Sequence, residues 1–268
     1  MISHPVNNKI SKLAQPACRI VLKAGKYLKD NSRKIKKISY KGAINLVTNV
    51  DHEVEDILIG SLRSAFPEIG VLSEESGKID YGPGLAWVID PIDGTTNFAH
   101  GFPFYAISVA LEKAGKPILG IVYNPEHNEF FYAEKGKGAF LNGKSIKVST
   151  QKYLKKSLLM TGFSYKLGKS MEENLVHFRH FLMSSQALRR AGCASLDLCY
   201  VACGRLEGFW ELDLFPWDTA AGWLIVKEAG GEVTDFTGKQ YCHNSNKILA
   251  TNGKIHKQMI KILSRRQK

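Results

Sequence analysis

The stretch that decides the fold is Trp87-Val-Ile-Asp-Pro-Ile-Asp-Gly-Thr-Thr-Asn-Phe98. Its apolar beginning predicts a strand that runs into Asp90, after which Pro91 fixes φ and Gly94 permits a sharp turn. A bend here aims the carboxylates of Asp90 and Asp93 at one point beyond the strand. Two carboxylates that converge without a basic neighbour repel each other unless a cation lies between them. The pattern therefore predicts a site for a hard divalent cation.

The residues that follow indicate what such a cation would do. Mg²⁺ prefers oxygen ligands and commonly bridges carboxylates to a substrate phosphate. Gly94, Thr95 and Thr96 supply backbone N–H groups at the start of a short predicted helix, where an anion is favoured. A metal site beside an anion site indicates phosphate chemistry.

Two further acidic residues stand at predicted element ends. Glu74 follows a strand in Ser73-Glu-Glu-Ser76, and Asp218 opens a helix in Phe215-Pro-Trp-Asp-Thr-Ala-Ala-Gly222. An Asp at a helix start is also favoured as an N-cap, so capping explains Asp218 about as well as metal ligation does. An isolated Asp before Gly is typical of an ordinary turn.

Hydrophobic patterning predicts two helices and then a sheet in the first half of the chain. Apolar residues from Ile10 to Leu28 recur at helical spacing, with Pro16 kinking or splitting that helix. A second apolar stripe over Val50–Phe66 predicts a helix that Pro67 ends. Short β-rich runs between Gly, Pro and Asn residues then predict a largely antiparallel sheet of Ile69–Ser73, Leu85–Asp90, Phe104–Lys113, Ile118–Asn124, Glu129–Glu134 and Ile146–Ser149.

The second half alternates strands and helices, which is typical of helices packed on sheets. We expect an α/β (α+β) architecture with a mostly antiparallel N-terminal sheet and a smaller mixed C-terminal sheet. The halves 1–150 and 151–268 are expected to form one cooperative unit. Before a last basic helix, the predicted elements are Leu158–Gly162, Met171–Ser184, Ala194–Ala202, Leu206–Leu212, Pro216–Ala229, Glu232–Phe236 and Ile248–Thr251.

The net charge of the 268-residue chain is +12, which alone suggests a nucleic-acid or anionic-membrane partner. The charge is uneven: residues 1–50 carry +10, residues 51–253 carry −4 and residues 254–268 carry +6. The acidic middle contains every candidate metal ligand. No apolar run suits a membrane helix or a signal peptide, and the five cysteines form no paired C-x-x-C motif. We therefore expect a soluble, cytoplasmic protein.

Taken together, the motifs resemble the inositol monophosphatase family of lithium-sensitive, Mg²⁺-dependent phosphatases. The resemblance implies the layered αβαβα sugar-phosphatase fold, two or three Mg²⁺ ions and hydrolysis of myo-inositol monophosphates or similar polyol phosphates by metal-activated water. It also implies inhibition by Li⁺ and a homodimer. The motifs that carry it occur in order along nearly the whole chain: Leu46–Asp51, Glu74–Ser76, Trp87–Phe98, Arg189–Asp197 and Pro216–Gly231.

The resemblance also assigns roles to individual residues. A Thr hydroxyl is a weak base alone, but Thr95 can accept from the attacking water when Asp51 accepts its proton, and Glu74 is the candidate effective base. Lys41 matches a lysine near the metal site, whereas Asn45 replaces a frequent Asp. The implied metal ligands are Glu74, Asp90, Asp93, Asp218 and the backbone carbonyl of Ile92. The implied substrate contacts are Gly94, Thr95, Thr96, Gly192, Cys193, Ala194, Glu211 and Asp218.

Several alternatives stay open or are disfavoured by spacing. Three other phosphate esters remain candidate substrates: adenosine 3′,5′-bisphosphate, fructose 1,6-bisphosphate and histidinol phosphate. Small structural changes around Gly192 and Glu211 would decide which ester is bound. Haloacid-dehalogenase-like phosphatases use D-x-D-G-T, whereas this chain has D-x-x-D-G-T. The loop is also not an EF-hand, because it lacks Asp or Asn at alternate positions and the Glu at its end. An RNA or protein partner for the basic ends remains open, although no nucleic-acid-binding motif supports it.

Overall fold

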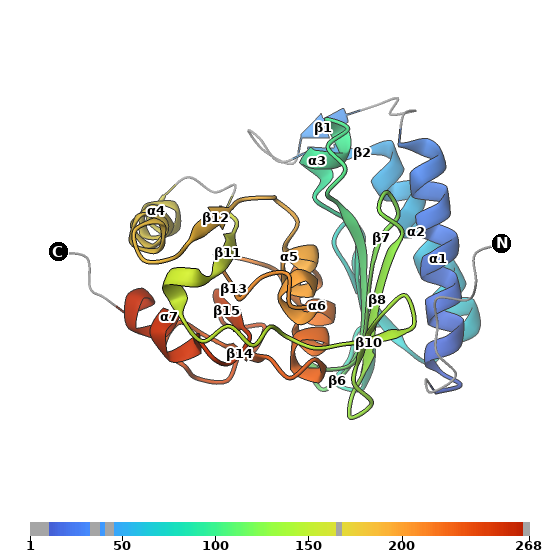
Figure 1. Ribbon diagram of the computed structural model, residues 1–268. Helices are drawn as coiled ribbons and strands as arrows, with labels where there is room; N and C mark the ends of the chain where they lie inside the picture. The colour runs from blue at the N-terminus through green and yellow to red at the C-terminus, as the bar shows by residue number, and fades with distance from the viewer. Residues whose placement is uncertain (1–10, 33–37, 41–45, 165–167, 265–268) are drawn as a thin grey trace.

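The computed structural model describes residues 11–32, 38–40, 46–164 and 168–264, and it is built of alternating layers of helices and sheets (Figure 1). One pair of helices covers the outer face of the larger sheet, a second pair lies between the sheets, and a third covers the far face of the smaller sheet. The predicted αβαβα layering is confirmed. In layer order the helices are α1 (Ala14–Asn31) and α2 (Asn49–Ala65), α5 (Ala194–Ala202) and α6 (Pro216–Glu228), α4 (Lys169–Leu182) and α7 (His256–Leu263).

The larger sheet has the strand order β10-β9-β8-β7-β6-β5-β3-β4. Its pairings are antiparallel except for β3 with β5, so the predicted antiparallel character is confirmed. The predicted strand over 146–149 is wrong beyond Ile146, where β10 ends. The strands are β3 (Gly70–Ser73), β4 (Gly77–Ile79), β5 (Leu85–Asp93), β6 (Ala106–Lys113), β7 (Lys116–Asn124), β8 (Glu129–Glu134), β9 (Ala139–Leu141) and β10 (Lys144–Ile146).

The smaller sheet has the order β12-β11-β13-β15-β14 and is mixed, as predicted. β11 pairs in parallel with β12 and β13, whereas β15 pairs antiparallel with β13 and β14. Its strands are β11 (Leu158–Thr161), β12 (Ala187–Arg189), β13 (Gly208–Leu212), β14 (Glu232–Thr234) and β15 (Lys247–Thr251). Smaller elements are the pair β1 (Ile38–Tyr40) and β2 (Leu46–Thr48), the short helix α3 (Thr95–Ala99) and the 3₁₀ turn η1 (Leu154–Lys156).

The helix boundaries show which sequence signals acted as expected. α2 ends at Ala65, just before Pro67, as predicted. The predicted kink at Pro16 is wrong, because α1 begins at Ala14 and places Pro16 in its first turn. There the fixed φ and the missing N–H of proline are tolerated.

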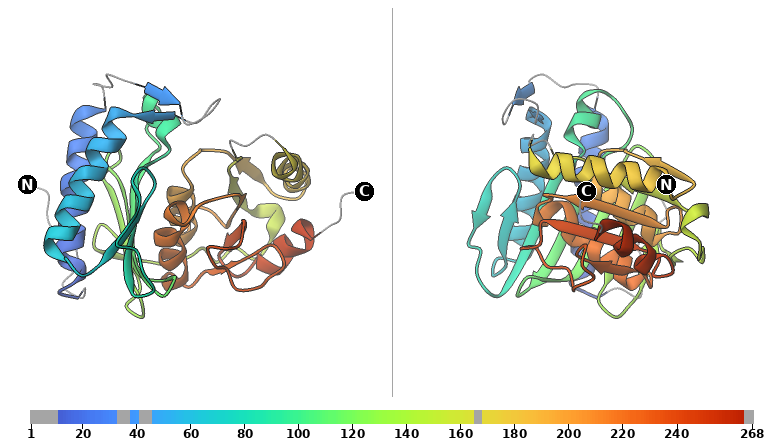
Figure 2. Two further views of the ribbon diagram at one scale, coloured as in Figure 1. Left: turned by 180° about the vertical axis from the view of Figure 1, so that it is seen from behind. Right: turned by 90° about the vertical axis from the view of Figure 1, so that its left-hand side faces the viewer.

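Three hydrophobic cores hold the layers together. The first joins α1 and α2 to one face of the larger sheet around Trp87, and Figure 2 shows these two helices side by side on that face. The second joins the other face to α5, α6 and the smaller sheet, with Val122, Leu198 and Phe209 among its members. The third lies under α4 and α7 around Trp210. The middle core thus contains residues of both halves; their cooperative unfolding stays a prediction.

Among the helices of the described residues, none has the length and apolar character that crossing a membrane would require.

Candidate metal centre

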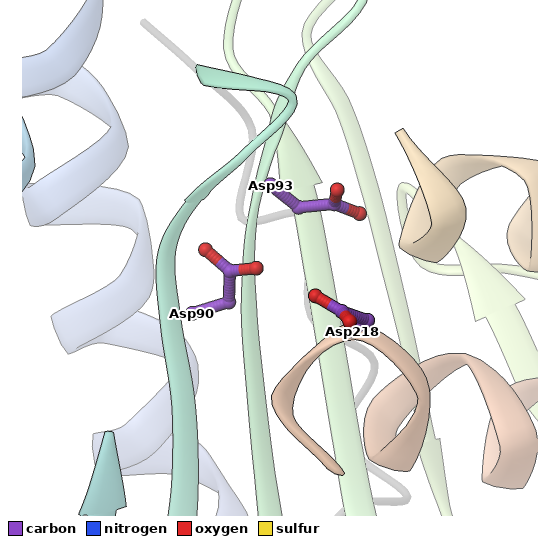
Figure 3. A group of neighbouring side chains, drawn as sticks. All are labelled: Asp90, Asp93 and Asp218. Atoms are coloured by element: carbon purple, nitrogen blue, oxygen red, sulfur yellow. The ribbon is translucent and has the colours of Figure 1, made fainter. Parts of the chain in front are cut away.

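A bulge at the end of β5 sets the direction of Asp90 and Asp93. Residues three apart on a regular strand point to opposite faces, because side chains alternate. Here Asp90 is opposite Ser108 while Asp93 is opposite Ala106, so three steps on β5 match two steps on β6. Such an extra residue redirects the side chains that follow it. Both carboxylates therefore point to the same side of the strand, toward Asp218 (Figure 3).

Asp218 reaches this point from the first turn of α6. It is the third helical residue, whereas the N-cap position belongs to Phe215, and its Oδ2 accepts a hydrogen bond from the Phe215 N–H at 2.7 Å. An oxygen of Asp218 also lies with one oxygen each of Asp90 and Asp93, all within 4.8 Å of one another. The sequence allows an N-cap role or metal ligation for Asp218. The structure places Asp218 in the first turn rather than at the N-cap and brings it together with the other two acids, while its ligand role stays a prediction.

The electrostatics of these three acids fit a divalent cation. Asp90 is 1% and Asp93 8% exposed, and Asp218 is half-buried. Burial raises the pKa of each carboxyl, and the charges of Glu74, Asp93 and Asp218 raise that of Asp90 further. None of the three takes part in a salt bridge between described residues. Two buried carboxylates and a half-buried one, without a basic partner among the described residues, suit a hard, oxygen-preferring cation such as Mg²⁺.

The start of α5 connects the second half of the chain to Asp93. Asp93 Oδ2 accepts hydrogen bonds from the Ser195 N–H at 2.6 Å and from Cys193 Sγ at 3.3 Å. These bonds partly offset the effect of burial on the Asp93 pKa. The predicted substrate segment 192–194 therefore lies beside the acids, with Ala194 as the first residue of α5.

Gly94 allows this close approach of the two halves. Its φ of +91° lies in the region that favours glycine, and a Cβ there would lie 3.2 Å from the Gly192 carbonyl oxygen and 3.3 Å from Cys193 Cβ. Gly94 and the predicted substrate segment are thus brought together. Thr95 and Thr96 follow directly in the first turn of α3.

The predicted pair of Thr95 and Asp51 is in contact. Thr95 Oγ1 lies 3.2 Å from Asp51 Oδ1 and 2.9 Å from the carbonyl oxygen of Ile92, so its proton has two acceptors. The other oxygen of Asp51 accepts from the N–H and hydroxyl of Thr48 at 2.8 and 2.5 Å, which caps α2. Burial raises the pKa of Asp51 to about 6, although the bonds from Thr48 oppose the shift.

Comparison with known proteins shows which family the chain belongs to. The sequence model of the Inositol monophosphatase family matches residues 9–268, nearly the whole chain. The chain belongs to the inositol monophosphatase family. The resemblance inferred from the motifs is therefore confirmed.

Relatives of this family member carry two kinds of name. The inositol-1-monophosphatase of Synechocystis sp. is 42% identical over 250 residues, which cover 92% of this chain and 87% of the relative. The Nus factor SuhB of Pseudomonas aeruginosa is 42% identical over 228 residues, which cover 83% and 84%. The crystal structure of the extragenic suppressor protein suhB from Bartonella henselae matches with a TM-score of 0.91 at 38% identity and covers 95% of this chain and 99% of that one. This last similarity confirms the fold.

Glu74 borders the three acids of the inositol monophosphatase fold. It follows β3, is half-buried, and its N–H donates to the carbonyl oxygen of Ile89 at 3.2 Å. Among the neighbouring acidic charges, that of Glu74 raises the pKa of Asp90 the most. Within the described part of the chain, the group of oxygens closer than 4.8 Å does not include Glu74, so its ligand role stays a prediction.

Glu211 lies on β13 within reach of the charge of Asp93. It is 7% exposed, and burial, followed by the charge of Asp93, raises its pKa to about 8. A Cβ added at Gly162 would lie only 2.2 Å from Oε1 of Glu211, so the Glu211 carboxylate fills the space beside Gly162. The predicted substrate residue thus borders the acidic centre. Lys41 and Asn45 lie outside the described residues.

Asp197 is a buried acid at the edge of this site, and its ionisation should lower the stability of the fold. It is fully buried, and neither carboxylate oxygen has a hydrogen-bond partner among the described residues. Burial, with the charges of Glu211 and Asp93, raises its pKa well above the usual range. Because this pKa is higher in the folded than in the unfolded state, the free energy of unfolding decreases as the pH rises from the unfolded-state pKa of about 3.9 toward the folded-state pKa.

We therefore expect Asp197→Asn, which has no proton to lose, to melt at a higher temperature than wild type. The gain should grow from pH 5 to pH 8, by up to about 1.4 kcal/mol per pH unit until the folded-state pKa is reached. Thermal melts of both proteins at these two pH values test the prediction. An equal difference at both pH values would contradict it.

Proposed function

We propose that this protein is a Mg²⁺-dependent phosphomonoesterase that hydrolyses myo-inositol monophosphates or similar polyol phosphates. The observation that carries the proposal is the group of Asp90, Asp93 and Asp218, whose carboxylate oxygens lie within 4.8 Å of one another beside the pair of Thr95 and Asp51. Membership of the family and the name of the Synechocystis relative support the substrate class.

The three acids would hold the metal, with Glu74 and the carbonyl oxygen of Ile92 as further ligands and two or three Mg²⁺ ions in all. When bound, Mg²⁺ supplies Lewis-acid chemistry: it polarises the phosphate and lowers the pKa of the attacking water. The convergence of carboxylates from β5 and α6 means that the two halves of the chain share this task.

The chain's own residues would orient the attacking water. Thr95 donates its hydroxyl proton to Asp51 and so presents an oxygen lone pair to water. Asp51, with its pKa raised to about 6, is ionised at neutral pH and can take up a proton under mildly acidic conditions. Glu74 is the second candidate base, because its charge already acts on both Asp51 and Asp90.

Other residues would hold the substrate around this point. The N–H groups at the start of α3, from Gly94 to Thr96, would receive phosphate oxygens. Glu211 and the backbone of 192–194 would contact the hydroxyls of the alcohol. A carboxyl with a pKa of about 8 is largely protonated at neutral pH, so Glu211 would donate a hydrogen bond as well as accept one.

One phosphate-release experiment tests the proposal. The substrates are inositol 1-phosphate, adenosine 3′,5′-bisphosphate, fructose 1,6-bisphosphate and histidinol phosphate, each with and without Mg²⁺ and Li⁺. We expect the highest kcat/KM with inositol 1-phosphate, no turnover without Mg²⁺, and inhibition by Li⁺. Preference for another of these esters would reassign the substrate, and turnover without a divalent cation would refute the mechanism.

The contact of Glu211 with Gly162 allows its substrate role to be tested separately. In Gly162→Ala the new methyl group must displace the Glu211 carboxylate, a movable side-chain end. We expect KM for the preferred ester to rise about 10-fold with a smaller change in kcat, as for a lost binding contact. Gly60→Ala is the matched control, because a Cβ at Gly60 meets nothing within 4 Å. An unchanged KM in Gly162→Ala would remove Glu211 from the substrate wall.

We propose RNA binding as a second candidate function, favoured by the basic residues at the C-terminal end of the chain. Residues 254–268 carry six Lys or Arg residues and no acid. Binding through this segment would weaken with salt as phosphate contacts release counterions. Replacing Lys261, Arg265, Arg266 and Lys268 by Gln should abolish salt-dependent RNA binding. Equal binding by the variant and wild type would refute this role.

A further inference from the structure

α2 carries a second buried carboxylate one helical turn after Asp51. This residue, Glu55, is 2% exposed. Residues four apart lie on the same face of a helix. Asp51 contacts the turn that follows β5, whereas Glu55 contacts the turn that follows β3. One helix face thus presents a carboxylate to each of the two turns that carry the proposed site.

Glu55 holds the turn of residues 73–76 through four hydrogen bonds. Its Oε1 accepts from the hydroxyl of Ser73, from the Glu75 N–H at 3.1 Å and from the Ser76 N–H at 3.3 Å. Its Oε2 accepts from the hydroxyl of Ser76. The donors lie on both sides of Glu74 in the sequence, so the backbone that carries the Glu74 side chain is fixed from both directions.

The four hydrogen bonds compensate for burial of the Glu55 carboxylate. Burying a carboxylate is unfavourable unless hydrogen bonds replace its water, and Glu55 lies beside the acidic residues Glu74 and Glu75. The four bonds therefore hold the turn in one position, whereas a shorter or apolar side chain would remove the protein acceptor of the Glu75 and Ser76 N–H groups.

We propose that Glu55 is a positioning residue that holds the turn of residues 73–76 so that Glu74 faces the acids Asp90, Asp93 and Asp218, and that it thereby sets the affinity of this centre for divalent cations. The inference rests on the proposed function, because it takes Glu74 as a metal ligand. Asp51 and Glu55 together then make α2 the rigid frame of the site.

The test is a titration of metal-depleted protein with Mn²⁺, in which free Mn²⁺ is measured by its EPR signal. Loss of a residue that orients a metal ligand typically weakens metal binding by 10–100-fold, so we expect about this loss in Glu55→Ala. Glu55→Gln should stay within about 3-fold of wild type. Its amide oxygen can accept both backbone N–H groups, while its NH₂ faces the Ser76 hydroxyl, which can rotate to accept.

Glu53→Ala is the matched control on the same helix. Glu53 accepts hydrogen bonds from the Tyr27 hydroxyl at 2.8 Å and from Asn49 at 3.1 Å, so its loss also removes side-chain bonds from α2. We expect a lower melting temperature and unchanged Mn²⁺ affinity. The double variant Ser73→Ala, Ser76→Ala removes two of the four donors and should weaken Mn²⁺ binding even if Glu55→Ala fails to fold.

The possible outcomes are distinct. Wild-type Mn²⁺ affinity in Glu55→Ala or in the double Ser variant would overturn the inference and leave Glu55 a structural residue. An equal loss in Glu53→Ala would overturn it as well, because general destabilisation would then explain the effect. Absence of Mn²⁺ binding by the wild type would instead overturn the proposed function, and the inference with it.

Discussion

Asp93→Asn should reduce phosphate release at saturating Mg²⁺ by at least about 1,000-fold, which corresponds to about 4 kcal/mol of transition-state stabilisation. Asp93 supplies one of the three oxygens that lie within 4.8 Å of one another, and the substitution removes its negative charge from that centre. The amide oxygen of Asn can still accept from the Ser195 N–H, so the contact between the two halves persists. The measurement is kcat/KM for inositol 1-phosphate with Mg²⁺ present.

Thermal melts separate this effect from loss of the fold. Burial raises the pKa of Asp93, so the charged form is unfavourable in the metal-free protein, and Asn should not lower its melting temperature at pH 8. Mg²⁺ should raise the melting temperature of the wild type and raise that of Asp93→Asn much less. Asp56→Asn, an exposed acid on α2, is the control and should keep full activity. Full activity of Asp93→Asn would refute the assigned centre.

Thr95→Ala should lower kcat by about 100- to 1,000-fold and leave Mg²⁺ affinity within about 3-fold of wild type. The Thr95 hydroxyl contacts Asp51 and is not one of the clustered carboxylates. Its loss should therefore disturb the orientation of the attacking water and leave the metal-binding carboxylates in place. Positioned proton-transfer groups typically contribute factors of this size. An equal loss of Mg²⁺ affinity and of kcat would assign Thr95 to the metal site instead.

The same pair predicts a pH dependence. Asp51 must be ionised to accept a proton, and burial raises its pKa to about 6. Activity of the wild type should therefore rise with pH through about 6 and level off above it. In Asp51→Asn the residual rate should be low and should lack this rise. Profiles of kcat/KM from pH 5 to 8 measure both, and the same acidic limb in the variant would assign it to another group.

The fold was largely predictable because its signals are local. The apolar stripe of α2 and the stop at Pro67 needed no tertiary information. The predicted elements do not include the short strands β1, β2, β4, β9 and β12, each of three residues. So short a segment has no periodicity and forms only when a neighbour pairs with it. The predicted kink at Pro16 is wrong because the apolar spacing begins at Ile10 and so places Pro16 inside the helix, whereas α1 begins at Ala14.

The site was predictable in its residue types but not in its geometry. The sequence predicts that Asp90 and Asp93 converge, and the family resemblance adds Asp218. The bulge that makes Asp90 and Asp93 converge, however, depends on the register between β5 and β6. The cap of Thr48 on α2 did have a signal, since Thr-x-x-Asp before an apolar stripe resembles a capping box. Glu55 had none, because it looks like an ordinary polar helix residue until the turn that it holds is in place.

The most direct test of the account is a calorimetric titration of metal-depleted protein with Mg²⁺ at pH 7, in two buffers of different ionisation enthalpy. Carboxylates bind a cation in their ionised form, and burial with mutual repulsion raises the pKa values of Asp90, Asp93 and Asp218, so we expect metal binding to be accompanied by release of protons. We predict binding by the wild type with net release of protons, and a large loss of both affinity and proton release in Asp90→Asn. Binding without proton release, or binding that Asp90→Asn leaves unchanged, would contradict the account.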